Sequence, residues 1–117
     1  MEKVIVLPDV EDMLLELVNI LFREEYFSFR QNAKDYVNEI IDFISTIPTQ
    51  RKKATHRNRY GNWYCAFKIN KHTTWYISFN VEGEEYNVTH ITNNHTADYP
   101  RYIRGIKQVF FSLLENL

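Results

Sequence analysis

Residues 63–92, which read WYCAFKINKHTTWYISFNVEGEEYNVTHIT, decide the fold class of this chain. Aromatic and β-branched residues fill three runs, and such residues pack well on the surface of a sheet. The runs lie at 63–69, 73–81 and 85–92. Short polar segments join them, so we predict three antiparallel strands in a meander.

The middle run has a clear two-residue period. Trp75, Ile77 and Phe79 fall on one side, and polar residues lie between them. A strand with this pattern has one buried face and one polar or functional face. Cys65 is the only cysteine, and aromatic residues share its side of the first run. We therefore expect a buried thiol, no nucleophile and no internal disulfide.

Two amphipathic helices are expected before these strands. After a short β-branched strand at 3–7, Asp9 can cap the first helix. Apolar residues recur at helical spacing through both helices. In the second helix the apolar stripe runs from Ala33 to Ile47, and Pro48 ends it. We predict an antiparallel αα-hairpin that packs on the sheet.

A last helix is expected near the end of the chain. Asp98 can cap it, Pro100 suits its first turn, and apolar residues recur from Ile103 to Leu114. The predicted fold class is α+β, a twisted antiparallel sheet packed by an αα-hairpin in the order β-α-α-β-β-β plus a C-terminal helix. The 117 residues hold no repeat or linker, which predicts a single domain over 1–117.

The net charge of −1 hides a strong asymmetry along the chain. Residues 1–42 hold ten acidic and four basic residues, whereas residues 43–81 hold seven Lys and Arg and no acid. Residues 82–117 hold five acids and three bases. Segregated charge favours an electropositive face, which suits RNA or an acidic peptide. The alternative is a basic loop that is merely solvated.

Two groups of residues could carry chemistry. The first is the run from Arg51 to Tyr60, whose cations can bind phosphate oxygens and whose tyrosine can stack on a base. Its alternative is a solvated connection. The second group holds side chains that can move protons or stabilise charge on phosphorus. Its members are Lys68, Lys71, His72, Tyr76, His90, His95, Tyr99, Arg101 and Tyr102. For His90 a structural role at the rim of the core is the alternative.

The sequence predicts no metal site and no cofactor. It holds neither an HExxH nor a CxxC motif, and its three glycines are dispersed, so it lacks a phosphate-binding glycine loop. No apolar run approaches the roughly 20 residues of a membrane helix. The first residues also lack the pattern of a signal peptide. We expect a cytoplasmic protein without membrane contact.

Three stretches resemble the RelE/ParE superfamily, the toxins of bacterial type II toxin–antitoxin (plasmid stabilisation) systems. They are 60–64 (YGNWY), 75–79 (WYISF) and 90–95 (HITNNH) with Tyr99 beyond. The family packs a helical hairpin on a twisted antiparallel sheet, and its last strand ends in a His- or Arg-bearing turn followed by Tyr. The resemblance covers most of the chain. It implies a growth-inhibiting toxin that a cognate antitoxin protein neutralises.

The resemblance implies one of two activities. One branch of the family cuts mRNA on the ribosome as a metal-independent endoribonuclease, by attack of a ribose 2′-hydroxyl on the adjacent phosphate. The other branch inhibits DNA gyrase without catalysis. In the nuclease interpretation, which the basic run supports, two residues are the candidates for proton transfer, His95 and Tyr99. The same interpretation has four other residues bind the RNA phosphates: Lys53, Arg57, Arg59 and Lys68.

Two departures from the family pattern leave the activity open. Tyr64 stands where the family often has an arginine, and Thr96 follows His95 where the family often has another. The missing arginines weaken the nuclease interpretation, although Arg57, Arg59 or Lys68 can compensate. We take the nuclease as the working hypothesis. A gyrase inhibitor and a non-toxic interaction module of the same fold are the alternatives.

Overall fold

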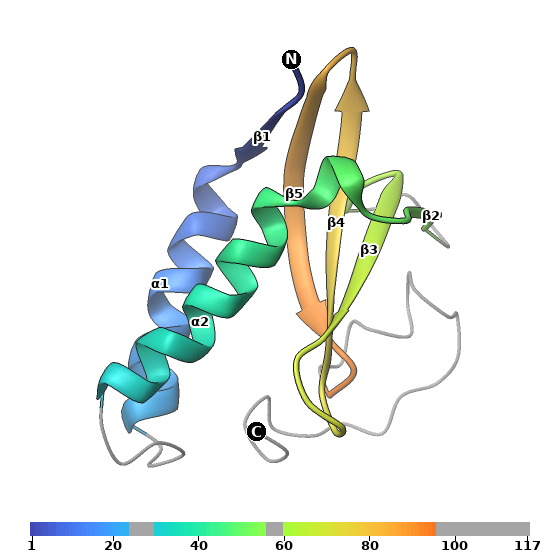
Figure 1. Cartoon of the computed structure of the whole chain (residues 1–117). Coiled ribbons are helices and arrows are strands. Elements are labelled where there is room, and N and C mark those ends of the chain that lie inside the picture. Colours follow the sequence, from blue (N-terminus) through green and yellow to red (C-terminus); the bar gives the residue numbers. More distant parts are fainter. Residues whose placement is uncertain (24–29, 56–59, 96–117) are drawn as a thin grey trace.

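The long strand β4 lies at the centre of the sheet, and the other elements are arranged around it (Figure 1). The computed structural model describes residues 1–23, 30–55 and 60–95. The described elements are β1 (Lys3–Val6), α1 (Pro8–Arg23), α2 (Arg30–Ser45), the short 3-10 helix η1 (Ile47–Thr49), β2 (Lys53–Ala54), β3 (Trp63–Lys68), β4 (Thr74–Glu82) and β5 (Glu85–Asn93). The strands form one sheet in the order β1-β5-β4-β3-β2. The predicted α+β class is confirmed.

The predicted meander of three strands is also confirmed. β3 pairs antiparallel with β4, and β4 pairs antiparallel with β5. In the first turn the Asn70 side chain accepts hydrogen bonds from the backbone N–H groups of His72 and Thr73. In the second turn Gly83 adopts φ 61°, a left-handed conformation that glycine reaches without steric penalty. Local turn chemistry therefore fixes both hairpins.

The prediction of a wholly antiparallel sheet is wrong at one edge. β1 pairs parallel with β5, from Lys3 opposite Glu85 to Val6 opposite Val88, so the sheet is mixed. No tight turn joins these two strands, and their relative direction follows from the path of the chain between them. The sequence pattern also missed β2, which pairs with β3 over Lys53 and Ala54. Two residues are too few to show a strand period.

The predicted helical hairpin is confirmed. α1 and α2 run side by side in opposite directions and lie against one face of the sheet (Figure 1). Their apolar stripes meet Trp75, Ile77 and Phe79 of β4, each at most 2 % exposed. The second helix ends at Ser45, and Pro48 lies in η1 just beyond it. The predicted C-terminal helix lies outside the described residues.

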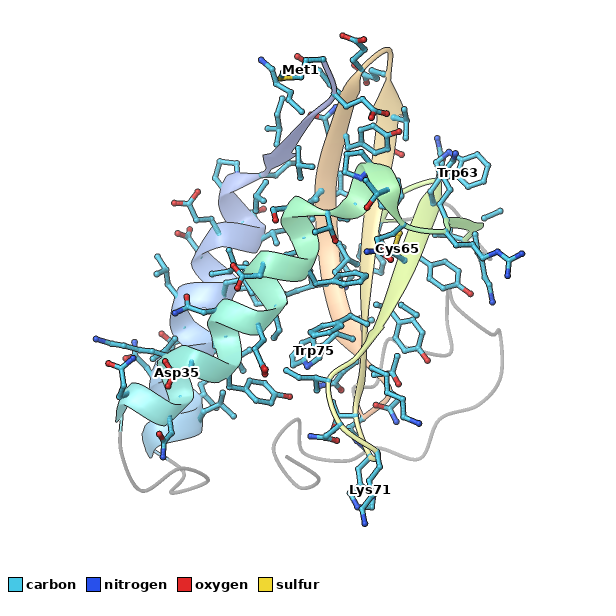
Figure 2. The ribbon with its side chains drawn as sticks, viewed as in Figure 1. Met1, Asp35, Trp63, Cys65, Lys71 and Trp75 are labelled. Carbon is cyan, nitrogen blue, oxygen red and sulfur yellow. The ribbon has the colours of Figure 1, made fainter. Side chains whose placement is uncertain are left out.

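A buried hydrogen bond ties α2 to β4. The indole Nε1 of Trp75 donates to the Tyr36 hydroxyl at 3.0 Å, and Figure 2 shows Trp75 between the sheet and the helices. Both residues belong to the core, at 2 % and 8 % exposure. Burial raises the pKa of Tyr36 to about 12. The phenol therefore stays neutral, and the indole N–H has its acceptor inside the core.

We predict that Tyr36→Phe destabilises the fold by about 1–3 kcal/mol, because the buried indole N–H of Trp75 loses its acceptor. Urea denaturation followed by Trp fluorescence measures the change. Tyr86→Phe is the matched control, since the Tyr86 hydroxyl donates to Glu2 at the exposed surface and should matter much less. Equal losses in the two variants would contradict the role given to the buried bond.

Candidate functional site

The sheet face turned away from α1 and α2, called the far face below, carries the candidate site. On β3 it bears Tyr64, Ala66 and Lys68, which alternate with the buried Cys65 and the half-buried Phe67 of the helix side. Directly paired residues of antiparallel strands lie on the same face. β4 therefore adds their cross-strand partners to the far face: Thr74, Tyr76 and Ser78.

Two aromatic contacts lie on the far face. The rings of Tyr64 and Tyr76 meet edge to face, with centroids 5.9 Å apart. The ring of Tyr60 stacks on the imidazole of His90, with centroids 4.0 Å apart and planes 15° from parallel. All four side chains are half-buried, so part of each ring remains accessible. Accessible rings of this kind can stack on unpaired bases.

Tyr60 reaches His90 because the chain just before β3 is bound across the far face. The Thr55 hydroxyl donates to the carbonyl of Gly61 at 2.6 Å, and the Thr89 hydroxyl donates to the carbonyl of Tyr60. A Cβ atom on Gly61 would come within 2.9 Å of the Phe79 backbone nitrogen. Only glycine allows this close approach, so the segment lies directly on β4.

A bulge in β5 presents the partners of Tyr60. The pairing with β4 shifts after Ser78, which faces His90, while Phe79 faces Val88. Thr89 is therefore the extra residue, and it lies beside His90 on the same stretch of strand. Bulges of this kind often re-aim side chains next to functional sites. Here the bulge brings the Thr89 hydroxyl to the Tyr60 carbonyl and the imidazole to its ring.

Lys53 and Lys68 both lie on the far face and are exposed. Lys53 pairs with Tyr64, and Lys68 stands four residues further along β3, which is about 13 Å at the usual rise of a strand. Lys52 points the other way, and its ammonium lies 4.9 Å from the ring centre of Trp63. The two far-face lysines thus flank the edge-to-face pair of Tyr64 and Tyr76.

A small hollow adjoins Lys53. It has a volume of about 200 Å³, and its lining combines two cations, an amide and a phenol-bearing ring: Gln50, Arg51, Lys53, Tyr64 and Ala66. Guanidinium and ammonium groups bind phosphate oxygens through charge-assisted hydrogen bonds. Arg51 belongs to the basic run 51–60, but the sequence alone did not bring it together with Lys53 and Tyr64, because that neighbourhood depends on the short strand β2.

His95 lies just beyond β5, under the turn between β3 and β4. Its Nε2 lies 2.9 Å from the carbonyl oxygen of His72 and 3.4 Å from the Thr73 hydroxyl. The side chain is only 7 % exposed. Because a carbonyl oxygen can only accept, Nε2 carries a hydrogen and donates it to His72. A proton-transfer role would therefore fall to Nδ1.

The described candidate residues separate into two places. Lys68 and His95 belong to the same end of the sheet, since Thr74, the partner of Lys68, donates its backbone N–H to the side chain of Asn94 at 3.1 Å. Lys53 lies on β2 beside the start of β3, where it pairs with Tyr64, the second residue of that strand. Five further candidates lie outside the described residues: Arg57, Arg59, Tyr99, Arg101 and Tyr102.

The Cys65 thiol is buried, as the strand pattern predicted, with 1 % exposure. Burial raises its pKa to about 11, so the thiol is protonated at neutral pH and is a poor nucleophile. Within residues 1–23, 30–55 and 60–95, no group of three or more His, Cys, Asp or Glu side chains could hold a metal ion. In the same part of the chain no helix is long and apolar enough to cross a membrane.

Comparisons with protein-family models, with curated proteins and with solved structures gave no match to this chain. A function can therefore be inferred only from the geometry of the far face. Its distinguishing features are the two aromatic contacts, the flanking lysines and the segment from Tyr60 to Asn62 that lies on the sheet.

We predict that Gly61→Ala displaces this segment, because the added methyl would meet Phe79 backbone and the Thr89 hydroxyl at 2.8–3.1 Å. The expected loss of stability is about 1–3 kcal/mol, and the stack of Tyr60 on His90 should loosen. Chemical-shift changes of the His90 ring protons report that movement. Gly83→Ala should cost about 1–2 kcal/mol from its left-handed conformation while leaving the His90 signals in place. Unmoved His90 signals in Gly61→Ala would refute the close packing.

Proposed function

We propose that this chain is the toxin of a type II toxin–antitoxin system of the RelE/ParE type and that it binds single-stranded RNA on the far face of its sheet. The observation that carries this proposal is the pair of aromatic contacts on the far face, with Lys53 and Lys68 on either side of the Tyr64–Tyr76 pair. Aromatic rings can stack on unpaired bases, and ammonium groups can bind phosphates. The proposed substrate is mRNA presented on the ribosome.

The charge distribution supports an anionic ligand on this face. No acidic residue occurs between positions 43 and 81, the part of the sequence that supplies β2, β3 and most of β4. The acidic residues of the first part of the chain lie largely on α1 and α2, across the sheet from the far face. This distribution of charge favours an anionic ligand on the part of the far face that β2 and β3 form.

Cleavage is the further step of the proposal. The 2′-hydroxyl of one nucleotide would lose its proton and attack the adjacent phosphorus, and the bond to the next 5′-oxygen would break as that oxygen gains a proton. The reaction needs one base, one acid and cations around the phosphorus, but no metal. His95, through Nδ1, and Tyr99 are the proposed proton-transfer residues. Lys68 is a cation at the same end of the sheet as His95.

A cognate antitoxin is part of the same proposal. A type II toxin is held inactive by a small protein encoded next to it, and an acidic extended segment of that protein would suit the same cations that bind RNA. Co-expression with the neighbouring open reading frame should restore the growth of cells that this chain stops. The proposal also places the protein in the cytoplasm, where its target is.

Inhibition of DNA gyrase is the second candidate function, and one observation favours it. The imidazole of His95 is almost fully buried, and its Nε2 is already bound to the carbonyl of His72. Tyr64, which stands where the nuclease branch often has an arginine, contacts Tyr76 instead of offering a cation. A surface of this kind can bind a protein target without any proton transfer.

We predict that Lys53→Ala and Lys68→Ala together weaken binding to a single-stranded RNA oligonucleotide and flatten its salt dependence. Each lost phosphate contact should change the slope of log K against log salt by about 0.7. Fluorescence anisotropy at several salt concentrations measures both effects. Lys34→Ala on α2 is the charge-matched control and should leave the slope unchanged. Equal slopes in all the variants would exclude RNA from the far face.

We predict that purified protein cuts ribosome-bound mRNA in a cell-free translation reaction and that His95→Gln abolishes the cuts. Glutamine can still donate a hydrogen bond to His72 but cannot exchange a proton near neutral pH. A variant that keeps both its fold and its cuts would show that His95 only holds the turn. Intact mRNA together with stopped growth would reject the nuclease, and a gyrase supercoiling assay would then test the second candidate.

A further inference from the structure

A second surface lies on the opposite side of the molecule, in the groove between α1 and α2. The groove has a volume of about 460 Å³ and an apolar lining. Its floor is formed by the buried Leu14 and Val37, and its rim carries two large exposed apolar side chains. These are Leu15, which is 63 % exposed, and Ile41, which is 44 % exposed. We call this surface the hairpin groove.

The two exposed residues of the rim are not explained by the protein's own core. Leu15 follows the buried Leu14, and Ile41 follows the buried Ile40, so each points about 100° away from the stripe that faces the sheet. Each helix thus carries one apolar residue outside its core stripe, and both residues line the same groove. Isolated exposed apolar residues are common, but here two of them lie on the rim of one apolar groove.

The groove carries opposite charges at its two ends. α1 and α2 run in opposite directions, so Glu11, in the first turn of α1, and Lys34, in the second turn of α2, line opposite ends. Both side chains are exposed, and neither forms an ion pair within the described part of the chain. The polar residues between them, Asn19 and Asn38, carry no charge.

We propose that the hairpin groove binds a second copy of this chain in a two-fold symmetric dimer. A two-fold axis through the middle of the groove exchanges its ends, so that Glu11 of each copy faces the partner's Lys34. The apolar middle then meets itself, with Leu15 and Ile41 of one copy against the same residues of the other. Charges of opposite sign at the two ends of one patch are what a self-complementary interface needs.

The size of the surface makes this dimer weak. Two helices of 16 residues are each about 24 Å long and together about 20 Å wide. They can bury roughly 500 Å² per copy, or roughly 1,000 Å² in total, which is below the ~1,200–2,000 Å² of stable complexes. A weak, transient dimer is therefore expected. The dimer leaves the far face, on the other side of the sheet, available.

The test is sedimentation velocity on the full chain between about 5 and 500 µM, a range in which a weak dimer forms and dissociates. The unmodified protein should pass from monomer to dimer across this range. Glu11→Lys sets two pairs of lysines against each other, and Lys34→Glu sets two pairs of glutamates against each other. Each single variant should dimerise at least about tenfold more weakly. The double variant E11K/K34E should recover the dimer, because both pairs are again of opposite sign.

Mixing the two single variants gives the sharpest result. In a dimer of one E11K copy and one K34E copy, both end pairs are complementary, so an equal mixture should dimerise more tightly than either variant alone. Lys3→Glu, on β1, controls for the change of net charge and should have no effect. Leu15→Gln should weaken the dimer without lowering the melting temperature, since Leu15 is largely exposed.

Three results would overturn the dimer: a monomer over the whole range, single variants that associate normally, or a mixture that stays monomeric. A groove occupied instead by a helix of another protein would give the first of these. The dimer is independent of the proposed toxin function. RNA binding by the monomeric variants should be unchanged, so failure of one proposal is distinguishable from failure of the other.

Discussion

Burial of Trp75, Ile77 and Phe79 under the two helices is the constraint on which the rest of the structure depends. These residues alternate along β4, which pairs with β3 and β5 over most of their length. A strand has a period of two, so a shift of one residue would exchange its buried and polar faces. Because three side chains of β4 face the helices, Tyr76 and Ser78 must face the far face. The bond from Trp75 to Tyr36 then holds α2 over this strand.

The same constraint divides the charge of the molecule between two sides. The acids of α1 lie across the sheet from the segment 43–81, which contains no acid. The net charge of −1 thus combines an acidic first part, a basic segment 43–81 and a slightly acidic last part, and it describes none of them. The far face offers cations and rings, whereas the hairpin groove offers apolar side chains between one acid and one base. The two surfaces can act independently, because the core separates them.

The parts of the fold that sequence could predict are those set by local pattern. The alternation in β4, the helical stripes and the turn residues at Asn70 and Gly83 all act within a few residues. The direction of β1 and the short strand β2 depend on contacts between distant segments, and no local pattern encodes them. The same limit applies to the site. Tyr60 was a candidate for stacking from its composition alone, but its contact with His90 requires the bulge at Thr89 and the close approach of Gly61.

The parallel pairing of β1 with β5 has a consequence for how the chain folds as the ribosome makes it. Lys3 leaves the exit tunnel early, yet its partner Glu85 follows only after the helical hairpin and three further strands. Contacts this distant in sequence close slowly, because the intervening loop must first be ordered. The two helices can form before β5 has been synthesised and can pair with β1. For that interval the edge of the nascent sheet is unpaired, and chaperones that hold extended segments would act at this stage.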